Sequence, residues 1–115
     1  MRIKLDFVTN SSSTAYYITN TSNEVKSLTD FVLENPDIIE AFKEQYDWYQ
    51  NDKRYSQLSL LESAARNNIK FKPGERRYCI FGDESGTIVG QVYDYMLRGG
   101  GRSKSFIWQF EEHLR

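Results

Sequence analysis

The sequence predicts a single α+β domain over residues 1–115, in which a mostly antiparallel sheet carries helices on one face. Three observations lead to this prediction. Strand-like segments lie toward both ends of the chain, helical segments follow one another in the first half, and turn-forming residues separate these segments. The expected order is β-β-α-α-α-β-β-α-β. With 115 residues, 39% of them hydrophobic, the chain is long enough to bury a core without disulfides or metals.

The first two strands are expected to form a hairpin. Apolar and polar residues alternate over residues 2–8, which is the period of a half-buried strand. The segment 10–13, an asparagine followed by three serines, breaks this alternation and favours a turn. β-forming residues resume over 14–19. The simplest arrangement therefore pairs residues 2–8 with residues 14–19.

Three helices are expected next, and the third spans residues 56–67. The first begins near Ser27 or Thr29, either of which can cap it. The second begins at Asn35–Asp37, where a capping residue, a proline and an acid follow one another. Helical spacing selects the side chains that are expected to face the core: Leu28, Phe31 and Val32 in the first helix, Ile39, Phe42, Tyr46 and Tyr49 in the second, and Leu58, Leu61 and Ala65 in the third.

The second half of the chain is expected to place one further helix among three strands. The strands lie over residues 69–72, 76–81 and 104–110, and the helix spans 87–98. Three glycines at 99–101 end this helix, and one of them is expected to supply a left-handed cap. The predicted core face of the helix is Val89, Val92, Tyr93, Met96 and Leu97, and the opposite face is Gly90, Gln91, Asp94 and Arg98.

The opening of the chain resembles that of a group of short proteins without an established activity. Residues 6–14 read Asp-Phe-Val-Thr-Asn-Ser-Ser-Ser-Thr, after a start of Met-Arg-Ile-Lys. Proteins of this group, from bacteria, archaea and their mobile elements, typically begin with a strand that ends in Asp-Phe-Val-Thr-Asn and continues into a serine run. The resemblance implies a mobile-element or phage context, and it transfers no functional residue.

No catalytic residue, metal site or cofactor is expected. A serine nucleophile needs a base within hydrogen-bond reach, and His113, the single histidine, lies next to the chain end. The segment Gly82–Gly86 falls between a strand and a helix, but its spacing fits neither a P-loop nor a nucleophile elbow. The lone Cys79 excludes an internal disulfide and a cysteine-rich zinc site.

A cytoplasmic protein without a membrane segment is expected. A single cysteine favours a reducing compartment. The basic start at residues 1–4 is not followed by the apolar stretch of a signal peptide. No segment approaches the ~18 apolar residues of a membrane span.

The leading hypothesis is a non-enzymatic module that binds another protein, such as a mobile-element or phage inhibitor of a host protein. Four aromatic residues lie within 46–55, and one helical face cannot bury them all. We expect Trp48 and Tyr55 to remain exposed and to anchor a partner, because exposed aromatic residues dominate protein interfaces. The predicted contact residues are Trp48, Tyr49, Tyr55, Glu40, Glu44 and Asp47.

The partner's chemistry follows from the charge distribution. Eight acids lie within residues 23–52, against two lysines, so the partner is expected to present a basic surface. In one version of the hypothesis, this acidic helical face mimics nucleic-acid phosphates. A net charge of −1 disfavours nucleic acid itself as the partner. A homodimer stays open as an alternative.

Two further classes of function are weighed against this hypothesis. The first is a binding site for a small molecule or a nucleotide. It would bring together Ser12 from the serine turn, Arg76 and Arg77 from the strand at 76–81, and Asp83 and Glu84 from the glycine-flanked turn after that strand. The second is a small hydrolase that uses these two carboxylates.

Overall fold

The computed structural model describes residues 13–46, 53–67, 69–82 and 87–114, and it confirms the α+β fold class. The predicted strand at residues 2–8 lies outside these ranges. The described elements follow the predicted order and add short strands: β2 (Ser13–Asn20), β3 (Lys26–Ser27), α1 (Leu28–Glu34), α2 (Pro36–Gln45), the 3-10 helix η2 (Lys53–Tyr55), α3 (Gln57–Asn67), β4 (Lys70–Phe71), β5 (Arg76–Gly82), α4 (Ile88–Met96), β6 (Gly101–Arg102) and β7 (Phe106–Leu114).

The main sheet is antiparallel, with strand order β5-β2-β7-β6, and β3 pairs with β4 in a second, smaller sheet. β2 lies inside the main sheet. Ser13 pairs with Gly82 of β5 on one side and with Leu114 of β7 on the other. Both edges of β2 are therefore occupied, and the predicted hairpin between residues 14–19 and residues 2–8 is wrong.

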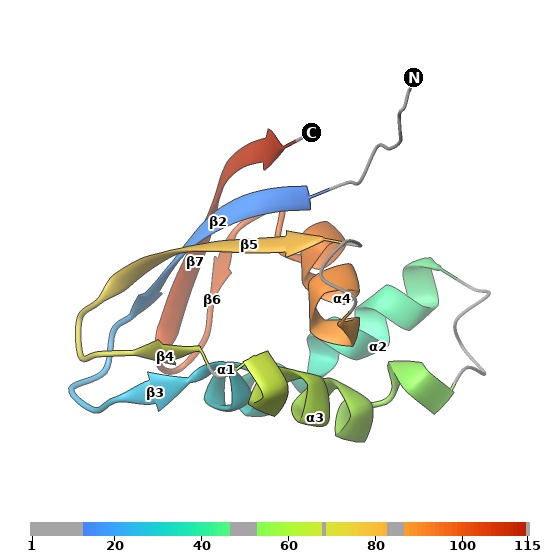
Figure 1. Cartoon of the computed structure of the whole chain (residues 1–115), viewed down its shortest axis with the longest axis horizontal. Coiled ribbons are helices and arrows are strands. Elements are labelled where there is room, and N and C mark those ends of the chain that lie inside the picture. Colours follow the sequence, from blue (N-terminus) through green and yellow to red (C-terminus); the bar gives the residue numbers. More distant parts are fainter. Residues whose placement is uncertain (1–12, 47–52, 68, 83–86, 115) are drawn as a thin grey trace.

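All helices lie on one side of the main sheet, and no described element covers its other side (Figure 1). The core fills the space between helices and sheet, and it is rich in aromatic residues. The ring of Phe31 in α1 makes edge-to-face contacts with Tyr93, Phe106 and Trp108, with centroids 5.1–5.2 Å apart. Such pairs each add about 1 kcal/mol to the burial of their apolar surface. Within the described ranges, every helix is too short or too polar to span a lipid bilayer.

Local sequence signals explain where the helices begin and end. Ser27 caps α1, because its hydroxyl accepts a hydrogen bond from Asp30 N while the Asp30 carboxylate accepts one from Ser27 N. Asn35 precedes Pro36 as predicted, but its side chain does not cap α2 and instead donates to Phe31 O. Beyond α4, Gly100 adopts the left-handed conformation (φ 72°), as expected for one glycine of this run.

Two predicted helix faces are wrong in part. α3 buries Leu60, Ser63 and Ala64, whereas Leu58, expected inside, is 67% exposed. At about 100° per residue, the apolar residues of this helix occupy a broad arc with Leu58 at one end and Leu60 and Ala64 at the other, so spacing alone does not say which part of the arc faces inward. In α4 the predicted core residues are buried or half-buried, but Asp94, expected opposite to them, is also completely buried.

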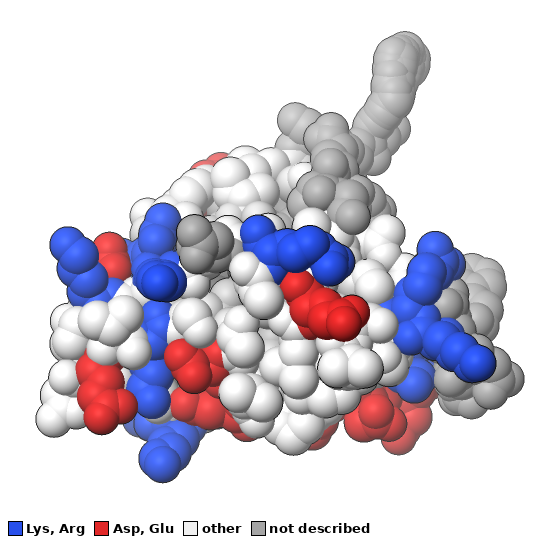
Figure 2. Space-filling model, turned by 60° about the horizontal axis from the view of Figure 1, so that its bottom comes forward, with Lys and Arg blue, Asp and Glu red and all other residues white. Residues whose placement is uncertain are grey.

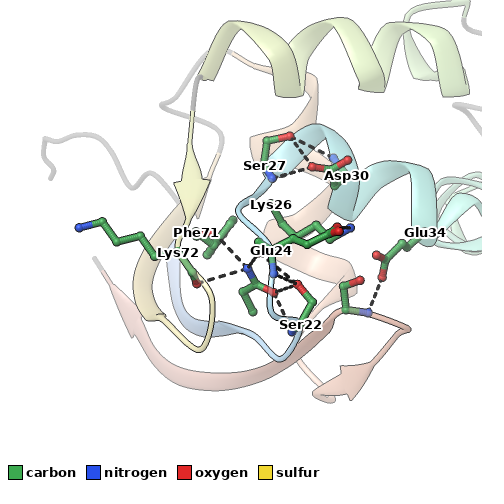
Figure 3. A network of polar contacts seen from close by, with 10 residues as sticks. Ser22, Glu24, Lys26, Ser27, Asp30, Glu34, Phe71 and Lys72 are labelled. Carbon is green, nitrogen blue, oxygen red and sulfur yellow. Dashed lines mark hydrogen bonds and ion pairs between the residues drawn. The ribbon is translucent and has the colours of Figure 1, made fainter.

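A buried asparagine joins the two sheets at the end of β2 (Figure 3). The Asn20 side chain donates to the carbonyl oxygens of Glu24, Phe71 and Lys72 at 2.7, 3.1 and 3.2 Å. Its own carbonyl oxygen accepts hydrogen bonds from the amide and the hydroxyl of Ser22. Both ends of the amide are satisfied, so this network fixes the loops around the small sheet at little desolvation cost.

Candidate functional site

The predicted partner-binding surface is described only in part. Asp47, Trp48 and Tyr49 lie outside the described residues. Glu40 and Glu44 are exposed on α2, as a steering surface requires. On the helix side of the molecule, however, basic and acidic side chains are interspersed, and neither sign covers the visible face (Figure 2).

The expectation that Tyr55 is exposed is wrong. Its side chain is only 4% exposed, its ring stacks on Phe42 with centroids 5.5 Å apart, and its hydroxyl bonds to Gln91. Tyr55 ends the separate 3-10 helix η2, so the helical spacing of the preceding helix does not predict where its side chain points. Burial removes Tyr55 from the surface that a partner can contact.

The predicted small-molecule pocket is not assembled. Ser12, Asp83 and Glu84 lie outside the described residues. Arg76 and Arg77 both lie at the start of β5 and point to opposite faces of the sheet, whereas the glycine-flanked turn follows the other end of this strand. A rise of ~3.3 Å per residue separates the two ends of β5 by roughly 20 Å. The two arginines therefore cannot share a small pocket with that turn.

The uncovered side of the main sheet presents a continuous surface, which we call the open sheet face. Side chains alternate between the two faces of a strand, and paired residues on neighbouring strands point the same way. Tyr16 and Ile18 point into the core, so Tyr17 and its cross-strand neighbours point out. The open sheet face consists of three rows: Arg76, Thr19, Ile107 and Arg102 at one end, Tyr78, Tyr17 and Gln109 in the middle, and Ile80 and Glu112 at the other end, on either side of Ala15, which is itself completely buried.

Large apolar and aromatic groups on the open sheet face are in contact with water and with each other. Tyr78 is 44% and Ile80 is 53% exposed. The rings of Tyr17 and Tyr78 meet edge to face at 5.5 Å, and the Arg76 guanidinium lies 3.9 Å from the centroid of the Tyr17 ring. These contacts hold the side chains in place before anything binds, which lowers the entropy cost of an interface.

Glu112 fixes the other end of the aromatic pair. The hydroxyl of Tyr78 donates a hydrogen bond of 3.0 Å to the Glu112 carboxylate. Desolvation and this hydrogen bond raise the pKa of Tyr78, so the hydroxyl remains a donor at neutral pH. The sequence predicts a strand over residues 76–81, but Tyr78, Cys79, Ile80 and Phe81 are all apolar or aromatic, so no change of polarity along the strand marks its outward face.

A second polar site, which the sequence analysis missed, lies where α4 meets the ends of β2 and β7. The Thr14 hydroxyl donates to Asp94 Oδ1 at 2.5 Å and lies 3.2 Å from Nδ1 of His113. Arg98 also contacts Asp94 Oδ1, at 3.2 Å, and Tyr16 donates to the Asp94 carbonyl at 2.7 Å. The other carboxylate oxygen, Oδ2, is buried and has no hydrogen-bond partner among the described residues. The spacing of Asp94 and Arg98, four residues apart, is the one sequence signal of this site.

This Thr14–Asp94 cluster has the chemistry of a clamp between α4 and the sheet. In a hydroxyl nucleophile site, a base takes the hydroxyl proton and a third group orients that base. Here Thr14 is fully buried and donates its proton to a carboxylate that Arg98 already pairs with. Burial raises the pKa of Tyr16, which keeps its hydroxyl protonated as a further donor to the helix.

Neither site brings metal ligands together. Across the described ranges, no three His, Cys, Asp or Glu side chains are grouped so that they could hold an ion. Cys79 is buried in β5, and the His113 ring lies against the Thr14 hydroxyl. Comparison with known proteins adds no further candidate: no family model matches the chain, and no curated protein and no solved structure is significantly similar to it.

Proposed function

We propose that this chain is a non-enzymatic module that binds another protein, and that the open sheet face is its binding surface. The observation that carries the proposal is the group formed by Tyr17, Tyr78 and Arg76 beside the exposed Ile80, on a sheet side that no described helix covers. Tyrosine and arginine are enriched where interfaces gain most of their binding energy. This surface replaces the one first expected around Trp48 and Tyr55.

The alternatives have less support. A nucleotide or small-molecule site would need Arg76 and Arg77 on one side of β5, and they lie on opposite sides. The carboxylates expected for a hydrolase, Asp83 and Glu84, lie outside the described residues, and the buried Thr14 hydroxyl is not an accessible nucleophile. Mimicry of nucleic-acid phosphates would need a face of one sign, whereas the face in Figure 2 is mixed.

The proposed setting is the cytoplasm of a host cell, with the protein acting as a mobile-element or phage inhibitor. Burial raises the pKa of the Cys79 thiol to about 11, which suits a cysteine that stays reduced and unreactive. The mobile-element context rests on the resemblance of residues 6–14 alone.

The experiment is a quantitative capture assay with tagged protein as bait in an extract of the native host. Ile80→Lys places a charge on the open sheet face two residues from Tyr78 on the same strand, and it should reduce capture of the specific partner at least tenfold. Leu58→Lys is the matched control, because Leu58 is as large as Ile80 and at least as exposed but lies on α3. Near-UV circular dichroism establishes that both variants fold. Equal capture by wild type and Ile80→Lys would refute the proposal.

A thermal-shift screen separates the binding module from the alternatives. A ligand that binds only the folded state raises the melting temperature by mass action. Nucleotides and divalent cations should leave the melting temperature unchanged. A shift with any of them, retained in Ile80→Lys, would favour a small-molecule site elsewhere.

A further inference from the structure

We propose that the open sheet face binds a second copy of this chain, so that two sheets pack face to face in a symmetric dimer. This inference rests on the proposed function, because it takes the same surface as the binding surface and names its partner. The argument comes from the distribution of charge over the three rows.

One end of the open sheet face is basic and the other end is acidic. Arg76 and Arg102 flank Ile107 in the first row, and Glu112 follows Ile80 and Ala15 in the last. The aromatic pair of Tyr17 and Tyr78 lies between them. A single patch therefore carries both of the charges that an ion pair needs, separated by an apolar and aromatic middle.

Such a patch is complementary to itself. In a two-fold symmetric interface the same surface is used by both subunits, so residue i of one copy contacts residue j of the other, and j contacts i. A two-fold axis that lies in the interface midway between Arg76 and Glu112 brings Arg76 of each copy to Glu112 of the other. The middle row, with Tyr17 and Tyr78, then packs against its own copy at the centre, as buried anchors do in stable interfaces.

The two charges cannot pair within one chain. Arg76 and Glu112 are two strands and two rows apart. With strands ~4.8 Å apart and ~3.3 Å per residue along a strand, their Cα atoms are separated by roughly 16 Å. Arg76 instead lies over the Tyr17 ring, and Glu112 accepts from Tyr78, so each charge is held in place facing outward.

A nucleic acid fits this surface less well than a second copy. Stacked tyrosines and arginines do bind single strands, but they do so in a positively charged groove. Here Glu112 accepts the hydrogen bond of the very tyrosine that would stack on a base, and the chain has a net charge of −1. Like charge repels phosphate at that end of the face.

The test is sedimentation equilibrium of the full chain over a hundredfold range of concentration, with charge-reversal variants. The wild type should show a reversible monomer–dimer equilibrium. Arg76→Glu and Glu112→Arg should each weaken dimerisation at least tenfold. Each substitution places two like charges at both of the symmetry-related contacts between residues 76 and 112. The double variant R76E/E112R should restore most of the affinity, and only contacts between copies can produce this rescue.

Controls and contrary outcomes keep the two proposals apart. Arg66→Glu, a charge reversal at an exposed position of α3, should leave the dimer unchanged. A wild type that remains monomeric, or single and double variants without rescue, would overturn the dimer. If the wild type is monomeric while Ile80→Lys still abolishes capture of a host protein, the binding module stands and only the second copy fails as its partner. A monomer that binds labelled single-stranded RNA through Tyr17 and Tyr78 would overturn both.

Discussion

Each end of β2 buries a polar side chain, but only one of the two buried clusters has a hydrogen-bond partner for every polar atom. Asn20 at one end has partners for both its oxygen and its nitrogen. At the other end, Thr14 donates to Asp94, which keeps one buried oxygen without a partner in the described chain. Arg98 and His113, the groups that complete this cluster, are open to water.

This difference indicates which end of β2 contributes more to the stability of the fold. A fully satisfied buried network is rigid and specific, whereas an incomplete one costs desolvation energy that its contacts do not return. The Asn20 end joins two sheets and depends on every bond. The Thr14 end joins a helix to the sheet, and its exposed Arg98 and His113 side chains can bind water when a hydrogen bond is lost.

The largest effect is expected from Asn20→Ala. It removes one donor group that serves three carbonyl oxygens and one acceptor that serves Ser22. Leaving such groups buried and unpaired should lower the free energy of unfolding by about 3 kcal/mol. Urea unfolding followed by circular dichroism measures it. Asn23→Ala, at an exposed position of the same loop, should stay within about 0.5 kcal/mol of wild type; equal losses in the two variants would remove the distinction.

Thr14→Val should have a smaller effect, because its shape is conserved and only the hydroxyl is lost. A hydrogen bond to a charged group contributes about 2 kcal/mol, and this is the loss expected in urea unfolding. Thr19→Val is the matched control on the same strand, with its side chain on the open sheet face, and it should be nearly neutral. A loss in Thr14→Val as large as that in Asn20→Ala would show that the two ends are equivalent.

Acid should weaken the Asn20 end through Glu34. Burial alone would raise the pKa of Glu34, but hydrogen bonds from Ser105 and Ser103 outweigh it and lower the pKa below its ordinary value of 4.5. A depressed folded-state pKa means that this stabilisation is present above the unfolded pKa and is lost as the pH falls through the folded pKa. Ser105 links Glu34 to this end of β2, because Ser105 N donates to the Glu34 carboxylate and the Ser105 carbonyl oxygen accepts from Thr21 N.

The variant Glu34→Gln tests this assignment. It should be less stable than wild type at pH 7, and the gap should close as the pH falls below about 4. Glu40→Gln, on the exposed side of α2, serves as the control and should follow the wild type throughout. An unchanged gap at pH 3 would mean that the Glu34 carboxylate does not contribute through its charge.

The last prediction concerns the reactivity of the thiol of Cys79, a residue that pairs with Tyr16 between the two ends of β2. Here the expected effect is on the labelling of Cys79 and not on stability. Burial raises the pKa of its thiol to about 11, and the side chain is 5% exposed. Since the thiolate is the reactive form, labelling with a disulfide reagent at pH 8 should be slow in the folded protein and fast in urea. A cysteine introduced as Leu58→Cys in a Cys79→Ala background should react at once. Rapid labelling of Cys79 itself would indicate that β5 opens readily.

The fold class, the strands of the second half and the helix starts could be predicted because each rests on local signals. Ser27 caps α1, and Pro36 begins α2, through residues that are neighbours in the sequence. The errors all depend on distant partners. Asp94 is buried because Thr14 lies eighty residues away in the sequence and next to it in space. The direction of Tyr55 depends on the turn η2, and the occupied edges of β2 depend on strands near the other end of the chain.

The open sheet face could not be located from the sequence for the same reason. Alternation identifies two faces of β5 but does not say which one the helices cover. That choice follows from the pairing of Tyr17 with Tyr78 and from Cys79 pairing with the buried Tyr16.

The central position of β2 also has a kinetic consequence. Its register joins Ser13 to Leu114, so the strand can complete its pairing only after residue 114 has left the ribosome. Contacts this distant in sequence close large loops before they return any energy, and they slow folding. During synthesis, the helices have time to form while β2 waits for both neighbours, so a chain that stops before β7 leaves one long edge of this strand available for pairing with other molecules.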